Sequence, residues 1–292
     1  MSIMISKFNR NKALYAYSFI FPAIVFLFIF WVYPVLISIG TSFFKWDIVN
    51  PRVFVGFDNY RRMMTDYKFW NSVRVTFVYV FSTIIPTMFI SLLLASLLNR
   101  SIFMRALLRS IYFLPWTIAF IAISLIWKWM FNPSFGLFNQ ILSYFGLSPV
   151  NWLRDPRTAL SSIIILGIWW AIGYDLIIYL AALQSIDTQL YEAAVIDGAN
   201  NWQKFWNITW PGIREANVFV IIVSMIHAFQ IFDSPYAMTG GGPAGKTETI
   251  VLYIYKIAMR QFKFGYACTL SVFLFVVVLL LSIISLRLFT RE

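Results

Sequence analysis

The stretch GGGPAGKT, residues 240–247, carries the residue types that bind nucleotide phosphates. Gly240, Gly245, Lys246 and Thr247 occupy the fixed positions of the phosphate-loop pattern G-x-x-x-x-G-K-[ST], whose amides and lysine bind phosphate and whose hydroxyl binds Mg²⁺. That chemistry needs a β-strand before the loop and a helix directly after it. Here an apolar run and FDSPYAMT precede the glycines, and Pro243 lacks an amide hydrogen. We therefore interpret the match as false, with no nucleotide site on this chain and the glycines forming a tight turn.

The composition places the chain among membrane proteins. Of its 292 residues, 60% are hydrophobic and 12% charged, and the mean hydropathy is +0.75, whereas a soluble domain is about half apolar and a quarter charged. The net charge of +11 then indicates basic loops beside anionic lipid headgroups, not nucleic-acid binding. Cys268 is the only cysteine and His227 the only histidine, so the sequence predicts neither a disulfide nor a metal site.

Six segments are long and apolar enough to cross a bilayer, for which about 20 residues are needed. They are residues 13–39, 75–98, 111–131, 158–183, 216–237 and 266–289. The first follows a basic stretch as a signal peptide would, but its apolar run is too long for one, so we expect an uncleaved span. Lysine and arginine are nearly balanced between the two sides. The short basic runs KFNRNK and NRSIFMRALLR nevertheless favour both termini on the cytoplasmic side of the cell membrane.

A polar loop over residues 184–213 separates the fourth and fifth spans. Asp187 or Thr188 is suited to begin a short helix, and Gly198 to end it. Asn200 or Asn201 is suited to cap a second helix, over 202–208, that ends before the proline at 211. Two interpretations remain open: an amphipathic connector on the headgroups, or a surface for a partner protein. For the partner surface, the relevant residues are Glu192, Ala193, Ala194, Asp197 and Gly198.

Polar residues inside the fourth and fifth spans are candidates for a substrate path, because they are costly at membrane depth. They are Tyr174, Asp175, Ser224, His227 and Gln230. The alternative for each is a hydrogen bond between helices of the bundle. Gly173 marks a weak point in the fourth helix, and Arg74, Lys128 and Asp233 are expected to reach headgroups from the span ends.

The loop sequence EAAVIDGA followed by ITWP resembles the EAA loop of the integral-membrane subunits of ABC importers, with Trp210 where that family usually has leucine. Other stretches, in order along nearly the whole chain, resemble carbohydrate-importer permeases of the maltose, glycerol-phosphate and multiple-sugar type. They are FVGFDNYRRM (54–63), FLPWTIAF (113–120), WKWMFNPSFGLFNQIL (127–142), VNWLRDP (150–156), AALQSIDTQLYEAAVIDGA (181–199), FDSPYAMTGGGP (232–243), ETIVLYIYKIA (248–258) and GYACTLSVFLF (265–275).

The resemblance implies an all-α, six-span permease of the type I ABC importer fold, a single domain over residues 1–292 with both termini cytoplasmic. The loop would be a coupling helix in which Glu192 meets an arginine of a cytoplasmic ATPase subunit, Ala193 and Ala194 face its cleft and Gly198 provides the bend. ATP and Mg²⁺ would be bound by two such ATPase subunits, with no cofactor on this chain and no catalysis by it. The other expected partners are a second, homologous permease and an extracytoplasmic solute-binding protein. The loops 41–70 and 132–156 would dock that protein or act as lids.

The expected cargo is a sugar or oligosaccharide, with a solute such as a glycerol-phosphate as the alternative. Tyr174 and Ser224 match the sugar site of the maltose-type permease in residue type. A self-sufficient secondary transporter should show inverted repeats, and none is evident. A membrane enzyme would need a nucleophile–base or metal constellation, which one histidine and one cysteine in separate apolar runs do not supply.

Overall fold

The computed structural model describes residues 17–47, 49–99 and 103–290, with side chains up to residue 287. Its contacts divide the chain into two compact units. The first comprises Met1–Thr65 and Ile257–Phe273, and the second comprises Asp66–Lys256 and Leu274–Glu292.

The first unit begins with a long apolar helix, Tyr17–Thr41, which contains the π turn η1 (Phe28–Val32) and α2 (Tyr33–Thr41). A short antiparallel hairpin follows, formed by β1 (Phe44–Lys45) and β2 (Val53–Phe54), and then α3 (Asp58–Thr65). The prediction of an all-α chain did not include this hairpin. Within the described part of the first helix, no residue of its most apolar window is buried, which leaves that surface available for lipid.

Asn59 holds the turn after α2 in place. Its Nδ2 donates to the carbonyls of Ser42 at 2.9 Å and Phe44 at 3.0 Å. The Thr269 hydroxyl donates to the same Ser42 carbonyl at 3.1 Å. A Cβ on Gly265 would lie 1.8 Å from the Phe44 carbonyl oxygen, so this backbone approach requires glycine. The stretch FVGFDNY therefore contributes an architectural contact through its asparagine.

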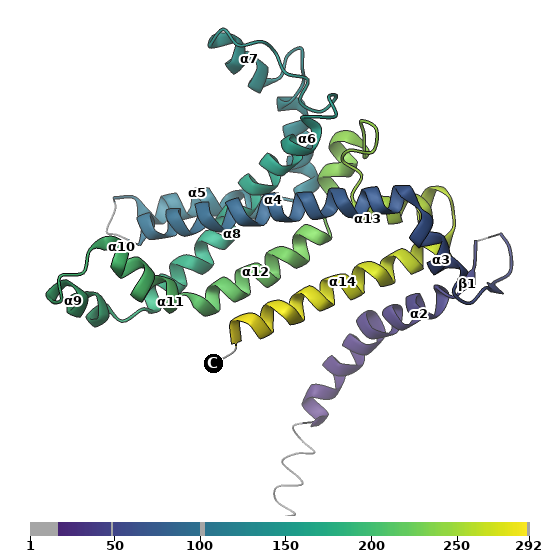
Figure 1. Cartoon of the computed structure of the whole chain (residues 1–292), viewed down its shortest axis with the longest axis horizontal. Helices are drawn as coiled ribbons and strands as arrows, with labels where there is room; N and C mark the ends of the chain where they lie inside the picture. Colours follow the sequence, from purple (N-terminus) through teal and green to yellow (C-terminus); the bar gives the residue numbers. More distant parts are fainter. Residues whose placement is uncertain (1–16, 48, 100–102, 291–292) are drawn as a thin grey trace, which may run out of the picture. The chain divides into compact units, whose positions relative to one another are not determined.

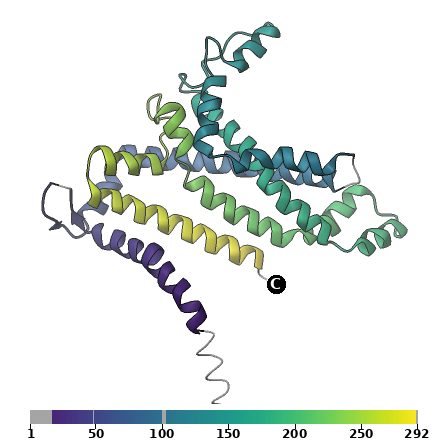
Figure 2. The same cartoon turned by 180° about the vertical axis from the view of Figure 1, so that it is seen from behind.

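The second unit is a helical bundle around α4 (Tyr67–Leu98) and α8 (Ala159–Ser185), as Figure 1 shows. Two further elements, η4 (Lys256–Arg260) and α14 (Phe264–Thr290), contain residues of both units. The remaining elements of the second unit are α5 (Arg105–Thr117), α6 (Phe120–Met130), α7 (Leu137–Tyr144), α9 (Thr188–Ile196), α10 (Asn201–Lys204), η2 (Phe205–Thr209), α11 (Trp210–Gly212), α12 (Arg214–Phe229), η3 (Pro235–Thr239) and α13 (Ile250–Tyr255). Helix α4 packs against α8, α12 and α13, and α5 packs against α8. The reverse view in Figure 2 shows α5 and α12 alongside α8 as well.

Four of the six predicted spans correspond to unbroken apolar helices, and the other two fall on pairs of helices that meet at a bend. Residues 13–16 of the first predicted span lie outside the described residues. The prediction of one continuous span over 111–131 is wrong, because α5 and α6 meet at a bend of 97°. Ile118 and Ala119 between them are extended, with ψ of 140° and 123°. Pro115 lies one turn earlier, and its ring and missing amide weaken the helix at this point.

The fifth span also differs from its prediction of 216–237, because α12 ends at Phe229. Gln230 leaves helical geometry, and Pro235 begins the separate π turn η3. At its other end α12 is bent by 64° from the helix over Asn201–Gly212. That second loop helix was predicted to stop before Pro211 but continues to Gly212. The π turn η2, in which Trp210 N–H bonds to Phe205 O, widens the helix just before the proline.

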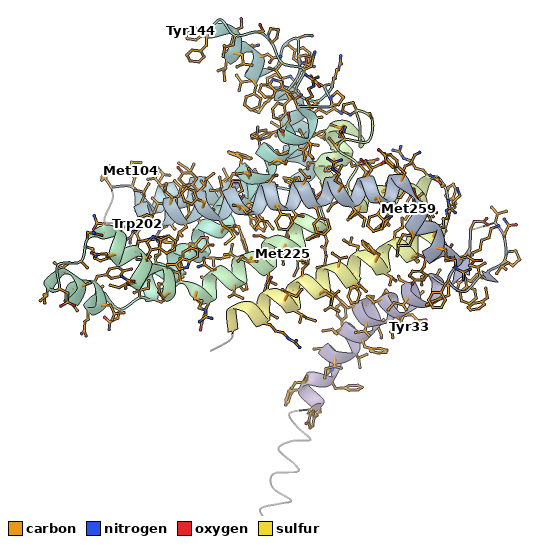
Figure 3. All side chains as sticks on the ribbon, in the orientation of Figure 1. Tyr33, Met104, Tyr144, Trp202, Met225 and Met259 are labelled. Carbon is orange, nitrogen blue, oxygen red and sulfur yellow. The ribbon has the colours of Figure 1, made fainter. Side chains whose placement is uncertain are left out.

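Two buried clusters stabilise the second unit. One contains Tyr79, Trp127, Ile163 and Phe229, together with Met225 of α12, which is labelled in Figure 3. The other lies nearer the loop 184–213 and contains Leu92, Leu176 and Ile213 among others. Within a bilayer such clusters hold helices together by close van der Waals packing, because lipid is as apolar as the core. These clusters fix α4, α8 and α12 relative to one another, and a pocket lies between them.

Candidate functional site

A pocket of about 220 Å³ lies in the second unit between α4, α5, α8 and α12, and we call it the α4–α8 pocket. All five residues predicted for a substrate path line it: Tyr174, Asp175, Ser224, His227 and Gln230. The bundle thus brings together residues from two spans and the turn after α12.

Aromatic side chains form one wall of the α4–α8 pocket. Trp116 of α5 stacks on Tyr174, with ring centroids 4.4 Å apart and planes 21° apart. It also contacts Trp170 at 4.0 Å and the edge of His227 at 5.5 Å. Trp116 lies at the end of α5, next to the bend, and Trp170 and Tyr174 are one turn apart on α8. Such a wall offers flat apolar faces to a ligand.

Three buried polar atoms that line the same pocket have no hydrogen-bond partner among the described residues. They are Thr87 Oγ1, Trp170 Nε1 and Asp175 Oδ2. Asp175 is only 1% exposed, and its carboxyl lies beside the Ser224 hydroxyl. Buried polar groups without partners are uncommon in folded proteins and need an explanation. A polar ligand, or water in its place, would satisfy this hydrogen-bonding capacity.

Two glycines allow the helices around the pocket to approach closely. A Cβ on Gly173 would lie 1.9 Å from the Tyr112 carbonyl oxygen, so α5 and α8 touch through their backbones there. A Cβ on Gly167 would lie 2.4 Å from the Tyr79 hydroxyl of α4. Gly173 was predicted as a weak point, but α8 continues through it without a break. Its role is close packing.

Trp116, Trp170 and Thr87 are pocket residues that are not predicted from the sequence, although Trp170 and Tyr174 are spaced i, i+4 and so share a helix face. Asp233, which is expected at the headgroups, lines the pocket instead. The same expectation for Lys128 stays a prediction; its Nζ donates to the Ala237 carbonyl at 2.9 Å.

The loop 184–213 forms the predicted helix, glycine turn and helix. Asp187 caps α9 by accepting from Gln189 N–H at 2.9 Å, which decides between the two predicted caps. Gly198 follows the helix with φ of +75°, a conformation that favours glycine. Glu192, Ala193, Asp197 and Gly198 are exposed, and Ala194 is half-buried. Within the described chain no side chain of α9 is buried, and Ile196 is 86% exposed.

The second helix of the loop, over Asn201–Gly212, is tied to α9 and carries a tryptophan stripe. Asn200 caps it through a reciprocal pair of hydrogen bonds with Gln203. The Tyr191 hydroxyl of α9 lies 2.9 Å from that of Thr209. Trp202, labelled in Figure 3, Trp206 and Trp210 contact one another in sequence along the helix. The loop is therefore an ordered structure with an exposed apolar and acidic surface.

The stretch GGGPAGKT forms a turn that is held by hydrogen bonds from its own and neighbouring side chains. It follows η3 and not a strand, and α13 begins only at Ile250. The Thr247 hydroxyl, which would bind Mg²⁺ in a phosphate loop, donates to the Gly242 carbonyl at 2.6 Å. Asn71 Nδ2 donates to the Gly245 carbonyl at 2.9 Å, and Lys256 pairs with Glu248 beside Gly241. Among the described residues, no group of three acidic, histidine or cysteine side chains could hold a metal ion.

Comparison with known proteins gives consistent matches over the chain. The model of the family described as binding-protein-dependent transport system inner membrane component matches residues 87–291. The trehalose/maltose transport system permease protein of Thermococcus litoralis is 34% identical, covering 97% of this chain and 96% of its own. The lactose transport system permease protein of Rhizobium radiobacter is 36% identical, covering 96% and 94%. A solved bacterial ABC transporter involved in the import of the acidic polysaccharide alginate contains a chain with a TM-score of 0.83 and 26% identity, covering 99% of each chain.

Proposed function

The chain belongs to the family of binding-protein-dependent transport system inner membrane components, and we propose that it carries a sugar or short oligosaccharide through the α4–α8 pocket. As a member of that family it is a multi-pass membrane protein and a permease subunit of an ABC importer. It is a transport subunit and not an enzyme. The proposal concerns its cargo, the path of the cargo and the coupling to ATP.

The pocket lining is the single observation that carries the proposal of a saccharide. Trp116 and Tyr174 offer stacked aromatic faces, which suit the apolar face of a sugar ring. Around them stand hydroxyl, amide and carboxyl groups with unmet hydrogen-bonding capacity, which suit sugar hydroxyls. The names of the trehalose/maltose and lactose relatives agree with this cargo.

The loop 184–213 is, in this proposal, the point where ATP hydrolysis by partner subunits acts on the permease. Exposed Glu192 and Asp197 would pair with cationic side chains of an ATPase subunit, and Ala193 and Ala194 would allow close contact. Gly198 would let the chain turn back toward α12. Two ATPase subunits would bind ATP and Mg²⁺, and a second homologous permease would complete the membrane part. The exposed apolar side chains of α9, such as Val195, fit a protein partner. They also fit the alternative of a connector that rests on the headgroups, and the ATPase measurement below separates the two.

The proposed topology follows from the loop. If it is cytoplasmic, both termini are cytoplasmic too, and GGGPAGKT at the other end of α12 lies outside. The loops 41–70 and 132–156 then face the extracytoplasmic side, where a solute-binding protein would dock. The whole chain, residues 1–292, would function as one permease domain. The trehalose/maltose and lactose relatives match it over nearly the whole of both chains, which supports this.

The coupling proposal is tested with the complex purified together with the products of neighbouring genes. Glu192→Ala and Gly198→Pro should remove most of the substrate-stimulated ATPase activity, because one deletes the anchor and the other forbids a positive φ. Glu215→Ala is the matched control, since Glu215 is an exposed carboxylate at the start of α12. Full stimulation in both loop variants would refute the coupling role.

The topology is tested by cysteine labelling in intact cells, in a Cys268→Ala background. A cysteine at exposed Ala244 should react with an impermeant maleimide. A cysteine at exposed Gln189 on α9 should be protected until the cells are opened. The reverse pattern would place the loop 184–213 outside and contradict the proposed orientation.

A further inference from the structure

The charge of the α4–α8 pocket is opposite to the charge of the chain. The sequence has 23 lysines and arginines against 12 acidic residues. The described residues that line the pocket nevertheless include Asp175 and Asp233 and neither lysine nor arginine. His227 is the one lining side chain there that can take up a positive charge near neutral pH. The pocket therefore has acidic groups and lacks a permanent cation.

Asp175 lines the pocket beside the aromatic wall. It comes from α8 one residue after Tyr174, whose ring forms the aromatic wall with Trp116. It is 1% exposed, and its Oδ2 has no partner among the residues that the structure describes. A sugar hydroxyl can donate a hydrogen bond to this oxygen, which gives a buried acceptor its partner.

The charged group of an anionic ligand cannot do this. A uronate carboxylate, a sulfate or a phosphate would bring a second negative charge close to Asp175, and two carboxylates sharing one buried site cannot both stay ionised. A buried charge without a counter-charge is strongly unfavourable. Arginine is the side chain best suited to bind carboxylate and phosphate in two-point fashion, and the described lining has none.

We propose that the α4–α8 pocket selects by charge, so that it admits saccharide units without a negative charge and excludes uronate, sulfated and phosphorylated ones. This inference rests on the proposed function, because it takes the pocket as the saccharide path. Family membership does not fix this property. The solved neighbour takes part in import of an acidic polysaccharide, whereas other relatives carry the names of neutral sugars.

The test measures weak binding directly on the purified complete complex, without its solute-binding protein, by saturation-transfer NMR. The probes are three matched pairs: glucose and glucuronate, galactose and galacturonate, mannose and mannuronate. The measurement is made at about pH 8, where an unperturbed imidazole is neutral. At least one neutral hexose should bind. The uronate paired with it should bind with an affinity lower by about tenfold or more. Asp175→Asn should narrow that difference, and Asp175→Glu should keep it.

The outcomes separate the two claims. A uronate that binds wild-type complex as well as its neutral partner overturns charge selection and leaves the pocket as the saccharide path. Absence of binding by every probe overturns both the pocket as the path and the selection. The wild-type comparison decides the question even if Asp175→Asn does not assemble, which gel filtration of the complex would reveal.

Discussion

The α4–α8 pocket and the loop 184–213 expose opposite kinds of unmatched group. In the pocket, polar atoms such as Asp175 Oδ2 and Thr87 Oγ1 are buried without a partner among the described residues. On α9 of the loop, apolar side chains such as Ile196 are open to solvent. A buried polar atom lacks a hydrogen-bonding ligand, and an exposed apolar side chain lacks a packing partner. In the proposed function, the first surface receives a small polar molecule and the second contacts a partner protein.

The same contrast appears in how each region is held. The pocket depends on backbone contacts between helices, such as Gly173 against Tyr112, so its geometry belongs to the whole bundle. The loop depends on local hydrogen bonds, such as Asp187 to Gln189 and Asn200 to Gln203. Changes at the helix contacts that form the pocket should therefore affect assembly as well as binding, whereas the structural effects of changes in the loop should remain local.

The largest expected effect is that of Gly173→Ala. Its Cβ would meet the Tyr112 carbonyl oxygen at 1.9 Å, and neither backbone can move without separating α5 from α8. We expect a loss of stability of at least about 1–3 kcal/mol, seen as a lower melting temperature and a lower yield of assembled complex. The matched control is Gly40→Ala in α2, where no described heavy atom lies within 4 Å of the added carbon. That change should be neutral or raise the melting temperature. Equal behaviour of the two variants would contradict the close packing of α5 and α8.

A second comparison separates structural hydroxyls from ligand-binding ones on one helix. Thr76 of α4 accepts from Ile250 N–H at 2.9 Å, so Thr76→Val leaves a buried donor unpaired and should cost about 1–3 kcal/mol of stability. Thr87 of α4 is equally buried, but its Oγ1 has no partner in the described chain. Thr87→Val should leave the melting temperature unchanged or raise it, and it should weaken saccharide binding measured by saturation-transfer NMR. If Thr87→Val destabilised the complex as Thr76→Val does, the hydroxyl would have a structural partner and the pocket would lose one ligand-binding group.

How much of the molecule the sequence predicts depends on the range of the interactions concerned. The spans follow from runs of apolar residues, and the caps Asp187 and Asn200 act on amides two or three residues away. Both features depend on local sequence and can therefore be predicted from it. The bend between α5 and α6 was missed because prolines such as Pro115 are tolerated inside membrane helices, and only the packing decides whether they break one.

The polar residues of the pocket were found because they are costly at membrane depth, but its tryptophans were not. Tryptophan is common near span ends as an interfacial anchor, so Trp116 beside Pro115 carried no distinct signal. Its stacking on Trp170 and Tyr174 depends on which face of α5 meets α8, and that contact is set by Gly173. No local pattern contains this information.

Trp116→Ala tests the aromatic wall with an intermediate expected effect. It removes the ring that stacks on both Trp170 and Tyr174, so saccharide affinity should fall about tenfold. Trp129→Ala is the control, because Trp129 is 57% exposed on α6 and does not line the pocket. Titration of each variant with the neutral hexose bound by wild type gives the comparison. If saccharide affinity fell equally in both variants, the stacking of Trp116 in the pocket would not be the cause of the effect.

The smallest effect is expected where the loop is held by a single cap. Asp187→Ala removes the acceptor of Gln189 N–H and should destabilise α9 by about 1 kcal/mol. Because α9 has no buried residue within the described chain, the melting temperature of the complex should hardly change. Hydrogen exchange of residues 188–196 should become faster, and substrate-stimulated ATPase activity should fall modestly. Asp155→Ala removes a similar side-chain bond, from Arg157 N–H at 2.9 Å, in another loop and should leave both readouts unchanged. If Asp187→Ala instead lowered the melting temperature as far as Gly173→Ala does, α9 would be part of the bundle's stability, and its exposed surface could no longer be attributed to a missing partner alone.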